Sequence, residues 1–151
     1  MSNAAVIAAR NRFEAARAWA ERFPLSLIQL GARLSVGAVF FNSGLLKYNS
    51  WEFAIKLFED EYKVPLLDPT IAARLAMFNE LVFPVFLFIG LATRLATLPL
   101  LGMTFVIEVF VYPMAWPEHL MWASLLVLVL TRGPGVFSLD HLIEQRLRKT
   151  H

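Results

Sequence analysis

Two carboxylates interrupt apolar stretches in which a charge is costly. Glu80 lies within the run 73–94, and Glu108 lies within the run 95–112. A charge near the middle of a membrane costs roughly 3 kcal/mol on insertion scales, so such groups normally face the protein interior and have a partner. Carboxylates in that setting can exchange protons or bind a polar ligand. These two acids are therefore the first candidates for chemistry.

Other polar side chains are expected at a similar depth. A helix rises about 1.5 Å per residue, so Glu80 lies about 13 Å from the start of its span and Glu108 about 20 Å from the opposite side of the membrane. We expect both acids to point into one cavity, with Lys47 and Tyr112 on its wall. Lys47 and Glu80 can form a structural interhelical pair or part of a binding site, and both interpretations stay open. The candidate pocket residues are Asn42, Lys47, Glu80, Glu108, Tyr112 and His119.

No metal site is predicted. Glu80, Glu108 and His119 could in principle hold one ion, but they lack the close spacing that makes such an assignment strong. Haem is disfavoured because His119 is the only one of the three histidines expected near the membrane. Ligation of haem iron by two histidines would therefore need a partner chain, whereas ligation by one histidine and one methionine stays open. A quinone among the phenylalanine-rich faces remains a candidate cofactor, although most of those side chains are expected to face lipid or to pack between helices. No catalytic residue is identified, and whether the chain is an enzyme stays open.

Composition indicates a membrane protein. The 151 residues are 58% hydrophobic and 17% charged, with no cysteine and a mean hydropathy of +0.57, whereas soluble domains are about half apolar and a quarter charged. The net charge of +2, without a basic cluster, argues against nucleic-acid binding. We predict an all-α bundle of four transmembrane helices, forming a single integral membrane domain over residues 1–151. The spans are expected at about 25–48, 71–92, 95–112 and 118–132.

Amphipathic segments flank the predicted spans. Residues 4–23 and 139–149 each predict a helix lying on the membrane surface, and 49–71 predicts a short interfacial helix followed by a loop. Basic residues favour the cytoplasmic side of a membrane. Nine of them flank one side and four the other, which places both termini in the cytoplasm. The nine are Arg10, Arg12, Arg17, Arg22, Arg94, Arg132, Arg146, Arg148 and Lys149, and the four are Lys47, Lys56, Lys63 and Arg74.

Three groups of residues occur in a characteristic order and spacing. They are Gly44-Leu45-Leu46-Lys47 before Trp51, Glu80 ahead of Gly90-Leu91-Ala92-Thr93-Arg94, and Gly133-Pro134-Gly135 followed by Ser138-Leu139-Asp140. Over residues 30–141 this pattern resembles the DoxX family. The resemblance implies a four-helix protein of the bacterial inner (cytoplasmic) membrane. Members are linked to redox enzymes, as subunits of thiosulfate:quinone oxidoreductase or as a membrane partner of superoxide dismutase and a sulfurtransferase. The landmark positions are Lys47, Glu80, Arg94 and Asp140, and no catalytic motif carries over.

Three functions follow as hypotheses. The first is a membrane subunit of a redox or quinone-linked system, with a polar pocket in the outer half of the bundle and the redox centre on a partner. The second is a small proton-coupled transporter or permease that uses Glu80 and Glu108. The third is a structural membrane anchor for soluble enzymes. The expected partners are the lipid bilayer and either another protein or further copies of this chain.

Overall fold

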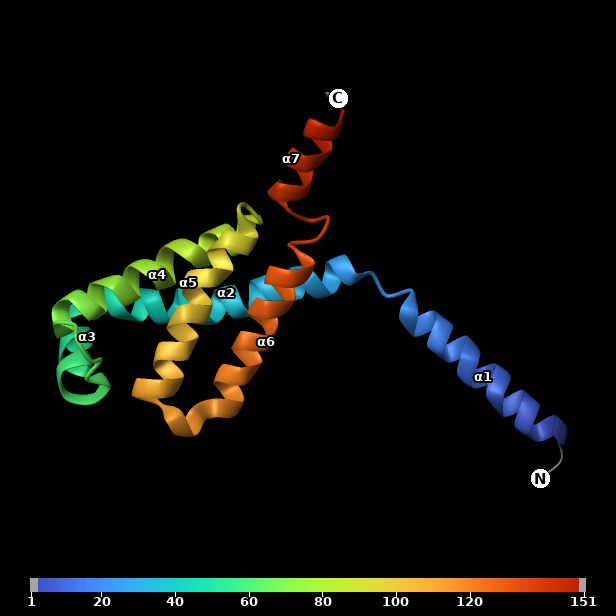
Figure 1. Ribbon diagram of the computed structural model, residues 1–151, viewed down its shortest axis with the longest axis horizontal. Helices are drawn as coiled ribbons and strands as arrows, with labels where there is room; N and C mark the ends of the chain where they lie inside the picture. The colour runs from blue at the N-terminus through green and yellow to red at the C-terminus, as the bar shows by residue number, and fades with distance from the viewer. Residues whose placement is uncertain (1–2, 150–151) are drawn as a thin grey trace.

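The computed structural model describes residues 3–149, which form helices and turns without a β-strand (Figure 1). Four helical stretches in this part of the chain are long and apolar enough to cross a membrane. The helices that form them are α2 (Leu25–Asn49), α4 (Pro69–Ile89), α5 (Thr93–Val106) and α6 (Trp116–Arg132). The predicted all-α, four-helix membrane bundle is confirmed. That residues 1–151 form a single domain stays a prediction.

The ends of the spans differ slightly from expectation. Helix α4 begins at Pro69 because the Asp68 side chain accepts hydrogen bonds from the backbone amides of Thr70 and Ile71, which caps the first turn. It runs through Pro84 and ends at Gly90, whose φ of +71° suits a left-handed helix terminus. Helix α6 starts at Trp116, two residues before the predicted start of the fourth span.

The four long helices form a closed ring. Helix α2 packs against α4 and α6, and α5 packs against the same two helices from the other side. A cluster of buried apolar side chains fills the centre: Val36, Phe40, Leu87, Ala96, Leu100 and Leu126. We call the end of the bundle where α2 finishes and α4 starts the α3 end. The opposite end, where α4 turns into α5 and α6 finishes, is the α7 end.

Two π-helical turns lie at the α3 end. Helix α3 (Trp51–Leu57) continues into η1 (Phe58–Tyr62), and α5 continues into η2 (Ile107–Val111). A short 3₁₀ turn, η3 (Pro113–Ala115), then leads into α6. The expected interfacial helix within 49–71 therefore exists, and its last turn is widened. Single π turns in proteins are frequent at functional sites, which directs attention to this end.

Arg33 fastens the α7 end from inside the bundle. Its side chain is buried, and its guanidinium donates hydrogen bonds to the backbone carbonyls of Pro134 (2.8 Å) and Phe137 (2.9 Å) and weakly to that of Phe88 (3.5 Å). One turn earlier, Gln29 donates to the carbonyls of Arg132 and Gly133. Helix α2 is thereby tied to the ends of α4 and α6 and to the loop after α6.

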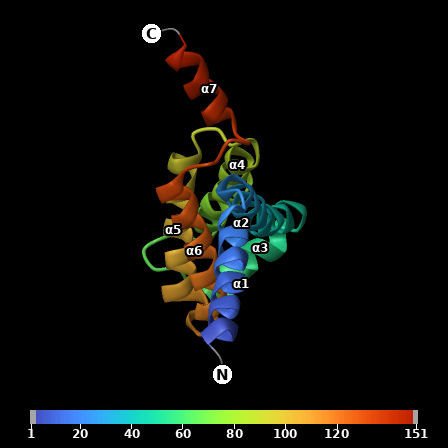
Figure 2. The same cartoon turned by 90° about the vertical axis from the view of Figure 1, so that its right-hand side faces the viewer.

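A flanking helix lies at each end of the chain. Helix α1 (Asn3–Glu21) extends away from the bundle, and α7 (Leu139–Arg148) projects from the α7 end (Figures 1 and 2). Both expose large apolar side chains, including Trp19 on α1 and Leu147 on α7. This composition, with arginines on the same helices, matches the amphipathic surface helices expected at the two ends.

Candidate functional site

An ion pair joins α2 to α4 near the α3 end. The Lys47 Nζ lies 2.8 Å from both carboxylate oxygens of Glu80. Ser43, one turn before Lys47 on the same face of α2, donates to Glu80 Oε1 at 3.0 Å and accepts from Lys47 Nζ at 2.9 Å. The side chains of Lys47 and Glu80 are 12% and 3% exposed, so the pair is largely shielded from solvent.

The two oxygens of the Glu80 carboxylate have different surroundings. Oε1 accepts hydrogen bonds from Ser43 and Lys47, whereas the buried Oε2 accepts none from the described residues although the ammonium lies 2.8 Å away. Buried carboxylate oxygens normally have a hydrogen-bond donor. Here the Lys47 ammonium compensates the charge on that oxygen through the ion pair.

A cavity of about 410 Å³, the α3-end cavity, adjoins this pair. Its volume falls within the usual range for small-molecule sites, and such sites combine apolar walls with few polar groups. Helices α2, α4, α5 and α6 and both π turns contribute to its wall. The polar side chains on the wall are Ser43, Lys47, Tyr62, Asn79, Glu80, Tyr112, Glu118 and His119; among the apolar ones are Phe58, Ala76, Met103, Val106, Ile107 and Trp122.

A second acid–base pair stands beside the cavity. His119 Nδ1 lies 2.6 Å from Glu108 Oε2, which joins η2 to the start of α6. The His119 side chain is 5% exposed and its ring packs on Trp122 with centroids 5.0 Å apart. The partner of Glu108 therefore comes from α6 and not from the helix that carries Glu108. The His119 imidazole, and not the Glu108 carboxylate, lines the cavity.

Tyr112 links the cavity to η1, which carries the acidic residues Glu59, Asp60 and Glu61. Its hydroxyl donates to Glu61 Oε1 at 2.6 Å, and its ring packs against Tyr62 with centroids 5.5 Å apart. The hydrogen bond to Glu61, followed by desolvation, raises the pKa of Tyr112 well above its ordinary value. Burial is the main cause that raises the pKa of Tyr62. Both phenols therefore stay protonated at neutral pH and can act as hydrogen-bond donors.

Four of the six sequence-predicted pocket residues line the α3-end cavity: Lys47, Glu80, Tyr112 and His119. The other two do not. Asn42 is exposed on α2, because it precedes Ser43 by one residue and so lies about 100° around the helix from the face toward Glu80. Glu108 is absent from the wall because its carboxylate is bound to His119. The expectation that Glu80 and Glu108 share the cavity therefore differs from the structure.

Most wall residues were not among the pocket candidates, and Ser43, Tyr62 and Trp122 illustrate why. Ser43 has a clear signal in the sequence, since it precedes Lys47 by four residues and so shares its face. Tyr62 and Trp122 carry no such signal, because their approach depends on η1 and on the packing of α6. Within residues 3–149, no group of three or more His, Cys, Asp or Glu side chains is arranged to hold a metal ion.

Comparison with known proteins gives a family. A sequence model of the DoxX family matches residues 28–113. An uncharacterised protein of Haemophilus influenzae is 31% identical over 119 residues, which cover 70% of this chain and 76% of that protein. No solved structure matches the chain. The match includes the Lys47–Glu80 pair and most of the α3-end cavity, and it covers more than half of the sequence. The chain belongs to the DoxX family.

Proposed function

We propose that this chain is the membrane subunit of a quinone-linked redox system and that the α3-end cavity holds the quinone headgroup. The observation that carries the proposal is the buried Lys47–Glu80 ion pair on the wall of a mostly apolar cavity. A quinone ring needs apolar walls, and its carbonyl oxygens need donors. Lys47 and Tyr62 are donors on this wall, whereas the Tyr112 hydroxyl already donates to Glu61.

The chemistry assigned to the chain is hydrogen bonding and proton supply. Reduction of a quinone to its hydroquinone consumes two electrons and two protons, and each carbonyl oxygen takes one proton. The electrons come from the redox centre of a partner protein. Lys47 is placed to donate to one quinone oxygen, and the Glu80 carboxylate beside it balances the charge of the ammonium group. The Glu108–His119 pair supplies a proton route to the cavity.

Quinone binding by purified protein tests the proposal. Trp122 lines the cavity, so decylubiquinone bound there quenches its emission, and Trp122→Phe removes that component of the quenching. We expect saturable binding that Glu80→Gln weakens by about tenfold or more, since hydrogen bonds to charged groups contribute about 1.5–3 kcal/mol. Glu80→Gln combined with Lys47→Met keeps the net charge and should bind equally weakly. Glu52→Gln on exposed α3 is the matched control. Binding unchanged by both cavity variants would refute the site.

A proton-coupled transporter is the second candidate, and the Glu108–His119 pair favours it. Acids and histidines inside a membrane often form proton relays in transporters, and this pair lies between the cavity and the outer surface of η2. Uptake of a substrate into proteoliposomes that depends on a pH gradient, and that Glu108→Gln and His119→Gln abolish, would establish this alternative in place of the quinone site.

We further propose that the protein resides in a bacterial inner membrane with both termini in the cytoplasm. The distribution of basic residues supports this orientation, because nine flank the α7 end and its two surface helices while four flank the α3 end. The α3-end cavity then lies in the outer half of the membrane. The redox partner, or further copies of this chain, would bind to the outer surface of the four-helix bundle.

A further inference from the structure

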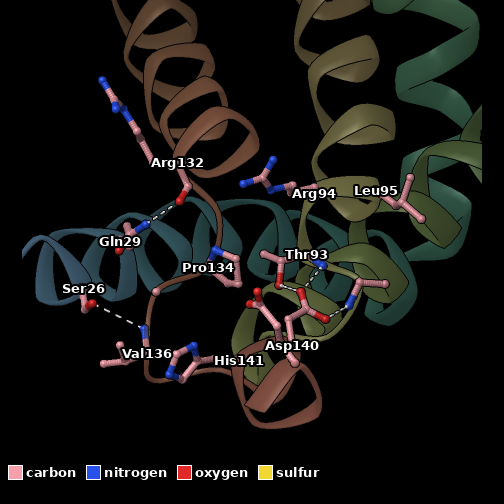
Figure 3. A pocket seen from close by; sticks show the side chains of 13 residues that line it. Ser26, Gln29, Thr93, Arg94, Leu95, Arg132, Pro134, Val136, Asp140 and His141 are labelled. Carbon is pink, nitrogen blue, oxygen red and sulfur yellow. Dashed lines mark hydrogen bonds between the residues drawn. The ribbon is translucent and has the colours of Figure 1, made fainter. Parts of the chain in front are cut away.

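A second pocket, of about 520 Å³, opens at the α7 end and takes no part in the proposed quinone chemistry (Figure 3). The start of α2, the start of α5, the last residue of α6 and the first turns of α7 enclose it. Two arginines stand on its wall: Arg94 in the first turn of α5 and Arg132 at the end of α6. Because both are at the ends of spans, they belong at the level of the lipid headgroups.

The acids of this pocket are already bound to other groups. Asp140 accepts from the backbone amides of Ala92 (2.7 Å) and Thr93 (2.9 Å) and from the Thr93 hydroxyl (2.8 Å), as Figure 3 shows in part. Glu144 accepts from Arg148 at 2.6 Å. Asp140 is therefore held by neutral donors at the edge of the pocket and keeps its charge, whereas the charge of Glu144 is compensated by Arg148.

The two arginines have no such compensation. Arg94 and Arg132 are exposed, and neither makes a side-chain hydrogen bond or ion pair with any residue in the described range 3–149. The Arg94 guanidinium lies over Gly133, 3.3 Å from where a Cβ on that residue would be, and Figure 3 shows it reaching from α5 toward the end of α6. With Glu144 paired to Arg148, two arginines stand against the single carboxylate of Asp140, so the pocket wall carries an excess of positive charge.

We propose that this pocket binds the phosphate of an anionic phospholipid, with Arg94 and Arg132 as its ligands. Basic pockets between membrane helices bind anionic headgroups in this way, and guanidinium groups match phosphate geometry. The helices that carry the arginines also expose the apolar side chains an acyl chain needs, since Leu95 and Leu98 on α5 and Val127 on α6 are 68%, 50% and 45% exposed. The lipid occupies the cytoplasmic leaflet in the orientation proposed above.

Native mass spectrometry of the full chain from neutral detergent, with equal phosphatidylglycerol and phosphatidylcholine, measures the preference directly. The unaltered protein should retain phosphatidylglycerol selectively. R94Q/R132Q should lower that preference about 25-fold, since each arginine near an anionic group contributes about fivefold. R12Q/R22Q removes two exposed arginines, one on α1 and one in the turn that follows it, and is the matched control, which should keep the preference. The single variants R94Q and R132Q should each lose about fivefold, and R94K/R132K should keep most of the preference.

A thermal-shift measurement distinguishes a lipid headgroup from free inorganic phosphate as the ligand. Phosphatidylglycerol should raise the unfolding temperature of the unaltered protein, while inorganic phosphate at the same concentration should not. Equal stabilisation by inorganic phosphate would assign the pocket to a free anion and overturn the lipid proposal. Undiminished lipid preference in R94Q/R132Q, or in both single variants if the double variant does not fold, would also overturn it. A loss as large in R12Q/R22Q would reduce the effect to general surface charge. None of these outcomes depends on quinone binding.

Discussion

Gly44 of α2 lies directly against Glu80 of α4. A Cβ added at Gly44 would come within 2.9 Å of the Glu80 Cβ and within 3.0 Å of the Leu81 side chain, closer than real Cβ atoms approach. The two helices therefore approach closely at a residue without a side chain. Small residues permit this kind of approach between membrane helices. It brings Ser43 and Lys47, on either side of Gly44, within hydrogen-bonding distance of one carboxylate.

Gly44→Ala should destabilise the bundle by about 1–3 kcal/mol, because an added methyl group must displace the Glu80 backbone or the Leu81 side chain. Gly31→Ala is the matched control on the same helix. Nothing lies within 4 Å of its Cβ position, so the better helix propensity of alanine should leave stability unchanged or slightly raised. Thermal unfolding in detergent, followed by circular dichroism, measures both. Equal unfolding temperatures would contradict the close approach.

Removing one member of the Lys47–Glu80 pair should cost more than removing both. Lys47→Met leaves the Glu80 carboxylate buried without its cation and should destabilise the protein by about 3–5 kcal/mol. Adding Glu80→Gln should restore part of that loss, because the uncompensated charge is gone. The double-mutant cycle, read from denaturation in detergent, gives the coupling free energy. Additive losses would show that the two side chains do not interact.

The Tyr112–Glu61 contact should make stability depend on alkaline pH. Folding raises the pKa of Tyr112 above the ordinary tyrosine value of about 10, mainly through its hydrogen bond to Glu61. A raised pKa means that the protonated form is stabilised by folding, so this contribution is complete below about pH 10 and is lost as the pH rises through the folded value. Tyr112→Phe should therefore lower the unfolding temperature at pH 8 and have a smaller effect at pH 11.

The control for that comparison is Tyr48→Phe, which removes an exposed tyrosine from α2. Its effect on the unfolding temperature should be small and should not change between the two pH values. Absorbance at 295 nm, recorded during an alkaline titration, should also show a late-ionising tyrosine that Tyr112→Phe eliminates. A Tyr112→Phe effect that is the same at both pH values would contradict the assignment.

Membrane orientation can be tested without function. A reporter fused after residue 151 should give a cytoplasmic signal, and a cysteine introduced at position 60, in a chain that has no other cysteine, should react with an impermeant reagent from outside only. Asp60 is exposed, so labelling there is not blocked by packing. The opposite pattern would place the α3-end cavity in the inner half of the membrane and the α7-end pocket in the outer leaflet.

The Lys47–Glu80 pair was predictable because its geometry depends on regular helices. Counting residues at about 1.5 Å each gives their depth, and the four-residue spacing of Ser43 and Lys47 gives their shared face. The fold follows from hydropathy for the same reason: backbone groups in a bilayer must be paired within helices. The DoxX motifs placed the turns at Gly90 and Gly133, where positive φ values occur.

The Glu108–His119 pair could not be derived in this way. The π turn at Ile107–Val111 and the 3₁₀ turn at Pro113–Ala115 both depart from 3.6 residues per turn, so helical counting loses the direction of Glu108. Arg33 shows a second reason why contacts cannot be derived from the sequence. Its position in an apolar run shows that it needs partners, but those partners are backbone carbonyls beyond α6 and at the end of α4, and carbonyls have no signature in a sequence.

The contacts of Arg33 and Gln29 make the two ends of the bundle unequal in the number of hydrogen bonds that hold the helices together. At the α7 end, hydrogen bonds from α2 hold the ends of α4 and α6, and Asp140 holds the start of α5. At the α3 end the polar contacts join helices in separate pairs, and two π turns interrupt regular backbone bonding. The helices should therefore separate more readily around Glu80, at the α3 end, than around Arg33, at the α7 end. Amide hydrogen exchange should be fastest in 58–62 and 107–111, and a ligand would enter there.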